Sequence, residues 1–79
     1  MNPFPNKAEV LRLRAQYPPG TRVELTAPMQ DPYEKLNAGE RATVLGVDDA
    51  GNILCRWDCG SSLSLIFGVD QFKMIGDSP

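Results

Sequence analysis

The chain has 79 residues, of which 42% are hydrophobic and 23% are charged, and its formal net charge is −2. This length predicts a single domain over residues 1–79. The acidic balance disfavours general nucleic-acid binding, although it is compatible with a local basic patch. No apolar run approaches the roughly 18–20 residues of a membrane-spanning helix, and the N-terminus has no signal-peptide pattern, so we expect a cytoplasmic protein without a membrane partner.

Residues 6–16 carry the clearest helix signal of the chain. Asn6 is a good N-cap, and Glu9 three residues later gives the spacing of a capping box. The segment 18–20 (Pro-Pro-Gly) ends the helix, because proline disfavours helical geometry in the residue before it and lacks a backbone donor. The apolar stripe at helical spacing consists of Val10, Leu13 and Tyr17, widened by Leu11.

Five short strands are expected after the helix. They cover residues 21–27, 39–47 and 53–57, a fourth segment containing Leu63 and Leu65, and a last one containing Phe72 and Ile75. Apolar and polar residues alternate along the first four with the period of a half-buried strand. Gly46 marks an expected bulge that returns Val47 to the inner face. The inward-facing residues are then Val23, Leu25, Ala42, Val44, Val47, Ile53, Cys55, Trp57, Leu63 and Leu65.

The connections between these strands differ in length. Residues 48–52 form a strong hairpin turn in which Gly51 is available for positive φ, and residues 58–60 form another tight turn. Residues 28–38 contain two prolines, mixed charges and no period, which predicts one long irregular loop. Long loops on small scaffolds often carry function.

This pattern predicts a mainly β protein, a small five-stranded SH3-like barrel over residues 20–75 that is preceded by one short N-terminal α-helix. Closing the sheet would protect its edges from pairing with other chains. The alternative is the five-stranded oligonucleotide-binding barrel. Its strands usually need more residues than the chain has left after the helix, so we rank it second.

The two cysteines, Cys55 and Cys59, stand four apart in a predicted strand and its turn, up to about 13 Å apart in extended chain. That separation is too long for a disulfide, so we expect two reduced thiols, as in the cytosol. The chain has no histidine. A structural zinc site would therefore need unusual ligands or a second chain, and we expect neither a metal nor another cofactor.

Several short strings together resemble a family of small bacterial and phage proteins described only as a domain of unknown function, the 4314 family. The likeness runs from the helix to Ile75, and one departure is Cys59, where similar proteins more often have a turn-favouring residue such as Asn. The resemblance implies an SH3-like barrel from bacteria or their mobile elements and implies no functional residues. The strings are Gly20–Leu25, Asp31–Tyr33, Gly46–Gly51, Trp57–Gly60 and Gly68–Asp70.

No constellation of catalytic residues is evident, so we expect that the protein is not an enzyme. An enzyme needs a nucleophile beside a base, two carboxylates in different environments, or a metal with an open position. The cysteines have no local base, Asp48 and Asp49 lie in a turn, and the serines of residues 61–64 lack the glycines of a nucleophile elbow.

A non-catalytic binding module is the function that we favour, with a protein or peptide as partner. The long loop and the turn after the third strand would form a shallow groove, and aromatic residues beside acids suit a basic or proline-rich peptide. The alternative for Trp57 is a place in the core, which its buried strand face favours. A loop tyrosine such as Tyr33 is the better contact residue, unless it only closes one end of the barrel. The proposed contact residues are Met29, Asp31, Tyr33, Trp57 and Asp58.

A second hypothesis is a phage or mobile-element accessory protein that sequesters a nucleotide signal or blocks a host defence protein. Arg22, Arg41 and Arg56 have outward parity and would form an anion-binding patch if their strands are adjacent. The alternative, which we favour, is a solvated face paired with Glu24 and Glu40. A third hypothesis, binding of single-stranded nucleic acid, needs exposed aromatics inside a basic groove, which the acidic balance opposes.

Self-association is a separate expectation. Strand parity does not bury Phe4, Leu45, Leu54 and Phe67, and a second copy of the chain would cover them. The alternative is that Phe4 folds over one face and the other three are ordinary scattered exposure.

Overall fold

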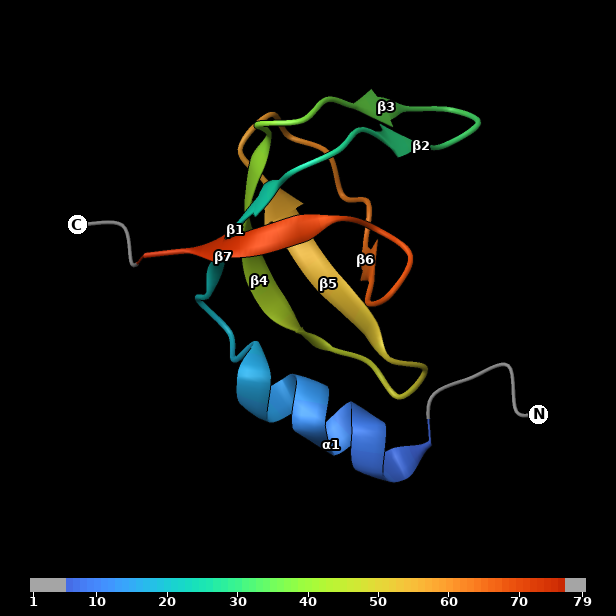
Figure 1. Ribbon diagram of the computed structural model, residues 1–79, viewed down its shortest axis with the longest axis vertical. Helices are drawn as coiled ribbons and strands as arrows, with labels where there is room; N and C mark the ends of the chain where they lie inside the picture. Colours follow the sequence, from blue (N-terminus) through green and yellow to red (C-terminus); the bar gives the residue numbers. More distant parts are fainter. Residues whose placement is uncertain (1–5, 77–79) are drawn as a thin grey trace.

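The computed structural model describes residues 6–76 (Figure 1). In this part of the chain one helix is followed by seven short strands. Their bounds are α1 Lys7–Gln16, β1 Arg22–Leu25, β2 Met29–Gln30, β3 Lys35–Leu36, β4 Arg41–Val47, β5 Asn52–Trp57, β6 Leu65–Ile66 and β7 Phe72–Ile75. None of the described helical sequence is long and apolar enough to cross a membrane.

The strands form two sheets. Five of them make one antiparallel sheet in the order β6-β5-β4-β1-β7, and β2 and β3 make a separate two-stranded hairpin. The sheet curls, so that β7 crosses in front of β4 and β5 in Figure 1. A mainly β fold with five sheet strands and one short helix is thus confirmed. The pairings within residues 6–76 do not join β6 to β7, and closure into an SH3-like barrel stays a prediction.

Helix α1 begins and ends where its sequence predicts. The side-chain oxygen of Asn6 accepts a hydrogen bond from the backbone N–H of Glu9 at 2.8 Å, which satisfies one of the free donors of the first turn. The predicted stripe of three residues is buried. Leu11 does not widen it: its side chain is 53% exposed, because the helix packs along one narrow face and Leu11 lies off that face.

The bulge at Gly46 is confirmed. The pairing of β4 with β5 shifts register between Val44 and Gly46, so Leu45 is the extra residue. Ala42 and Val44 face the core before the shift, and Val47 returns to it afterwards. Without the extra residue, strict alternation would point the Val47 side chain outward.

The prediction of one long irregular loop over residues 28–38 is wrong. Met29 pairs with Leu36 and Gln30 pairs with Lys35, so this segment is a short hairpin whose turn is residues 31–34. The periodic signal is hidden because each strand has only two residues, too few for an alternation to be recognised. The fourth predicted strand is also shorter than expected, since it contains Leu65 but not Leu63.

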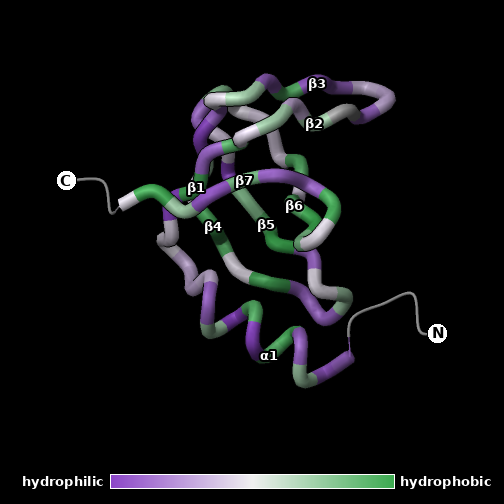
Figure 2. Tube along the Cα trace, in the orientation of Figure 1, coloured by the Kyte–Doolittle hydropathy of each residue, from purple (hydrophilic) through white to green (hydrophobic). Residues whose placement is uncertain are grey.

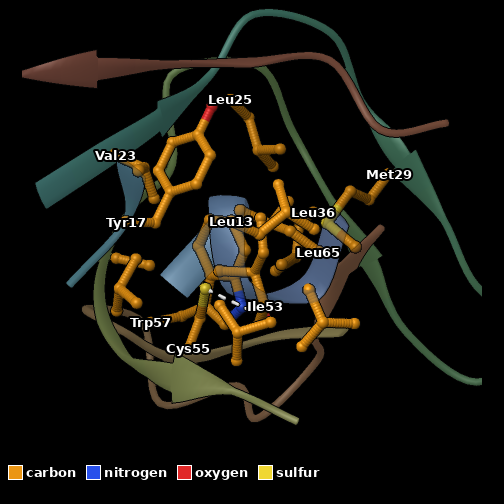
Figure 3. Close-up of a cluster of buried hydrophobic side chains, with 14 residues drawn as sticks. Leu13, Tyr17, Val23, Leu25, Met29, Leu36, Ile53, Cys55, Trp57 and Leu65 are labelled. Atoms are coloured by element: carbon orange, nitrogen blue, oxygen red, sulfur yellow. Dashed lines mark hydrogen bonds between the residues drawn. The ribbon is translucent and has the colours of Figure 1, made fainter. Parts of the chain in front are cut away.

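One hydrophobic core lies between the curled sheet, the hairpin and α1. Figure 3 shows side chains from all three pointing toward one another, and in Figure 2 the most hydrophobic stretches belong to the strands of the large sheet. Trp57 is the largest fully buried side chain. The members of the core are Val10, Leu13, Tyr17, Val23, Leu25, Met29, Leu36, Ala42, Val44, Val47, Ile53, Cys55, Trp57 and Leu65.

Candidate binding surface

The turn of the β2–β3 hairpin presents a fully exposed aromatic side chain. Asp31 and Glu34 exchange two backbone hydrogen bonds of 3.1 and 3.3 Å, and the Asp31 carboxylate accepts the N–H of Tyr33 at 2.9 Å. Proline follows Asp31, which suits the second position of such a turn. Tyr33 is 97% exposed as a result. We call residues 31–34 the hairpin tip.

The hairpin tip is held at its base by apolar contacts and one polar contact. Met29 and Leu36 insert into the core with exposures of 7% and 3%. The carboxylate of Glu34 accepts a hydrogen bond of 2.8 Å from the hydroxyl of Ser61, which lies in the segment after β5. In Figure 1 the hairpin lies at the end of the molecule opposite α1. The tip therefore projects from a fixed base.

Two of the predicted contact residues belong to the core, which corrects the expected surface at these positions. Trp57 is 1% exposed, and its indole N–H donates to the carbonyl oxygen of Leu63 at 2.7 Å. Of the two places predicted for Trp57, the structure therefore shows the one in the core. Met29 is buried, because its side chain is directed into the core (Figure 3) and its strand pairs with β3, where Leu36 is also buried. Neither side chain has the accessible area to contact a partner.

Asp58 is engaged by one of the predicted anion-binding arginines. The guanidinium of Arg22 donates to both carboxylate oxygens of Asp58 at 2.8 and 2.7 Å and to the hydroxyl of Thr43 at 3.0 Å. The hydrogen bond to Asp58 raises the pKa of Arg22, and the same bond lowers the pKa of Asp58. A carboxylate of the chain itself thus already binds the guanidinium of Arg22 through two hydrogen bonds.

Arg41 and Arg56, the other two predicted anion-binding residues, differ in whether they form an ion pair within residues 6–76. Arg41 donates to Glu24 at 2.8 Å, and Lys73 lies 3.6 Å from the same carboxylate. The hydrogen bond from Arg41 lowers the pKa of Glu24. Arg56 is exposed and makes no ion pair with a described residue. The register places Arg22, Thr43 and Arg56 in one row across β1, β4 and β5.

The two thiols have different environments. Cys55 is buried in the core, and this burial raises the pKa of its thiol to about 11. A thiol with such a pKa is almost fully protonated at neutral pH and is a weak nucleophile. Cys59 is exposed in the turn after β5 and, like Cys55, is unpaired. Residues 6–76 contain no cluster of three or more Cys, Asp or Glu side chains placed to hold a metal ion.

Sequence reasoning missed the two polar residues that fix the hairpin. Glu34 and Ser61 are 27 positions apart, and no local pattern signals that they meet. The expected exposure of Leu45, Leu54 and Phe67 is observed, whereas Phe4 lies outside the described residues. Ile66 is a further exposed apolar residue. Self-association stays a prediction.

The geometry defines a class of protein: a small, mainly β domain with a helix at one end and an exposed hairpin tip at the other. More particularly, residues 6–75 match the family model described as Domain of unknown function (DUF4314), and the chain belongs to this family. The resemblance found in the sequence is thereby confirmed. No curated protein matches the chain, and no solved structure matches it.

Proposed function

We propose that the chain is a non-catalytic binding module of the cytoplasm that engages a protein or peptide through the hairpin tip. The observation that supports this most strongly is the 97% exposure of Tyr33 on a turn with a fixed base. Any polar residue would serve this turn position, so the turn itself does not require a tyrosine. A large aromatic side chain kept in water is typical of a contact residue.

Tyrosine has physical properties that suit such a role. Its ring supplies a large apolar area, its hydroxyl makes hydrogen bonds, and only two χ angles must be fixed on binding. The tip backbone is already ordered by the Asp31 and Glu34 hydrogen bonds, which reduces the conformational entropy lost on association. Asp31 beside the ring favours a basic or proline-rich partner segment.

The phage or mobile-element hypothesis has two versions, and they draw on different residues. A protein that blocks a host defence protein would use the same hairpin tip. A protein that sequesters a nucleotide would use Arg22, Arg41 and Arg56, and two of these already bind carboxylates of the chain. The nucleotide version and the nucleic-acid hypothesis therefore have less support than a protein partner.

Identification of the partner comes first. The tagged protein is purified from cells of the organism that encodes it, and its ultraviolet absorbance ratio, its native mass and the co-purifying molecules are determined. We expect a retained protein and no nucleotide. Retention of a nucleotide, with the absorbance maximum moved toward that of a nucleobase, would instead favour the sequestering hypothesis.

The hairpin tip is then tested against the identified partner. Tyr33→Ala should weaken binding at least about tenfold, as truncation of a central aromatic contact does. Lys35→Ala is the matched control, because Lys35 is exposed on the same hairpin outside the tip and should change affinity little. Unchanged affinity of Tyr33→Ala would show that the hairpin tip is not the contact surface.

A further inference from the structure

The outer face of the large sheet carries a strip of exposed apolar side chains. Leu45, Leu54 and Ile66 are 50%, 39% and 47% exposed. At the bulge, Leu45 and Gly46 together face Leu54 across the β4–β5 pairing. Ile66 pairs with Asn52, so it is the diagonal neighbour of Leu54 on the same face. We call these three residues the outer apolar strip.

A cationic side chain borders the outer apolar strip. Arg56 follows Leu54 by two residues on β5 and therefore points to the same face. It is exposed and pairs across the sheet with Thr43, a neutral residue. Arg22 and Arg41 lie farther along this face, and each is bonded to a carboxylate. Arg56 thus differs from them because its guanidinium makes no ion pair with any residue from 6 to 76.

The charges next to the outer apolar strip differ between its two ends. Arg56 lies at one end. At the other end, the carboxylate of Asp48 accepts the side-chain N–H of Asn52, and the carboxylate of Asp70 accepts the backbone N–H of Ile66. A partner carboxylate is therefore attracted at the Arg56 end of the strip and repelled at the other end.

We propose that the outer apolar strip and Arg56 form a second docking surface, which takes a partner segment with apolar residues next to a carboxylate. The apolar residues would cover the strip, and the carboxylate would accept hydrogen bonds from the Arg56 guanidinium. This surface is separate from the hairpin tip, and the proposal does not rest on that site. Together the two surfaces would let one small domain bridge two partners.

A second copy of the chain suits this surface less well than an acidic partner. Most carboxylates of residues 6–76 already accept hydrogen bonds from arginines, a hydroxyl or turn amides. In that part of the chain only the carboxylates of Glu9 and Glu40 make no such bond. A homodimer would therefore offer Arg56 mainly carboxylates that already hold other donors, with Glu9 and Glu40 as the exceptions and with the hairpin-tip Asp31 holding only one backbone N–H.

The experiment uses two synthetic peptides as probes. One is an amphipathic helix of about five turns with leucines along one stripe and glutamates beside them, and the other has lysines in place of the glutamates. Each is titrated into the ¹⁵N-labelled full chain while amide chemical shifts are recorded. We expect the glutamate peptide to shift the amides of Leu45, Leu54, Arg56 and Ile66. It should bind at least about tenfold more tightly than the lysine peptide and lose affinity as salt is added.

Variants make the test specific. Arg56→Glu should reverse the preference between the two peptides, a result that mere loss of structure would not produce. Tyr33→Ala should leave peptide binding unchanged, so failure of this proposal is distinguishable from failure of the hairpin tip. Equal binding of both peptides, or shifts elsewhere on the chain, would overturn the proposal. A dimer that Leu54→Arg dissociates would overturn it as well, because a second copy would then be the occupant.

Discussion

The β4–β5 and β2–β3 hairpins place their aromatic residues in opposite environments. At the end of β5, Trp57 is 1% exposed and its polar atom is bonded within the chain, whereas at the tip between β2 and β3, Tyr33 is 97% exposed. The β4–β5 hairpin is the longest pairing of the sheet, and the β2–β3 hairpin has only two paired positions. The long hairpin supports the fold, and the short one presents a side chain that the fold does not use.

The turns of the β4–β5 and β2–β3 hairpins are ordered in the same way, but their residues at the apex differ. Asp48 accepts the backbone N–H groups of Ala50 and Asn52 at 3.0 and 2.8 Å, and the apex of that turn includes a small alanine. Asp31 accepts one N–H, that of Tyr33. Both aspartates order their turns by the same chemistry. Because one apex needs no aromatic residue, the aromatic residue at the other apex calls for an explanation outside folding.

The largest effect on stability is expected at Trp57. Trp57→Ala removes the largest buried side chain and its hydrogen bond to Leu63, and it should lower the free energy of unfolding by about 3–5 kcal/mol. Tyr33→Ala should change it by less than about 0.5 kcal/mol. Urea unfolding followed by circular dichroism measures both. If the two variants lose similar stability, the contrast between the hairpins is wrong.

A loss of this size is a large part of the stability expected for so short a chain, so Trp57→Phe serves as the milder control. It keeps an aromatic ring in the core but cannot donate to Leu63. Its stability should lie between those of the parent chain and Trp57→Ala. The order of the three proteins can be read from their urea midpoints even if the alanine variant is unfolded in water.

A smaller effect, which depends on pH, is expected at Asp48. The pKa of the Asp48 carboxyl is lowered, and the main cause is the hydrogen bond that it accepts from the backbone N–H of Asn52. A carboxyl whose pKa is lower in the folded state contributes stability above its unfolded pKa of about 3.9, and the contribution is lost as the pH falls through the folded value. Asp48→Asn should therefore be less stable than the parent at pH 7, and the difference in stability should narrow as the pH falls below the unfolded pKa.

Urea unfolding at several pH values measures this gap. The amide side chain of the Asp48→Asn variant keeps an acceptor oxygen for the turn, but it replaces the second carboxylate oxygen, which accepts the side-chain N–H of Asn52, with a donor. Only the part of the stability difference that changes with pH therefore reports the charge of the carboxylate. Glu24 and Asp58 also have lowered pKa values, but they are present in both proteins and cancel in the difference. A gap that is independent of pH would mean that the ionised form of Asp48 has no special role in the turn.

Much of the fold could be predicted from the sequence because its signals are local. The Asn6 cap, the bulge at Gly46 and the turn at Gly51, where φ is 85°, each depend on residues within a few positions of one another. Alternation then identifies the buried face of the longer strands. The β2–β3 hairpin escaped prediction because its two-residue strands are shorter than any recognisable period.

The candidate surfaces were less predictable because they depend on contacts between distant residues. Exposure of Tyr33 follows from its turn, but burial of Met29 depends on the pairing of β2 with β3. The three outward arginines look alike in the sequence. Only the strand register and the side-chain contacts show that Arg22 binds Asp58 and that Arg56 is left without an ion-pair partner among the described residues.

A modest loss of stability is expected at the polar contact that holds the hairpin tip. Glu34→Ala removes the acceptor of the Ser61 hydroxyl and should lower the free energy of unfolding by about 0.5–1 kcal/mol, whereas Glu34→Gln keeps an acceptor oxygen and should lose less. Hydrogen exchange should show faster exchange of the tip amides in the alanine variant. A looser tip loses more conformational entropy on association, so the same variant should weaken partner binding although Tyr33 is intact. Unchanged exchange in Glu34→Ala would show that Met29 and Leu36 alone hold the hairpin.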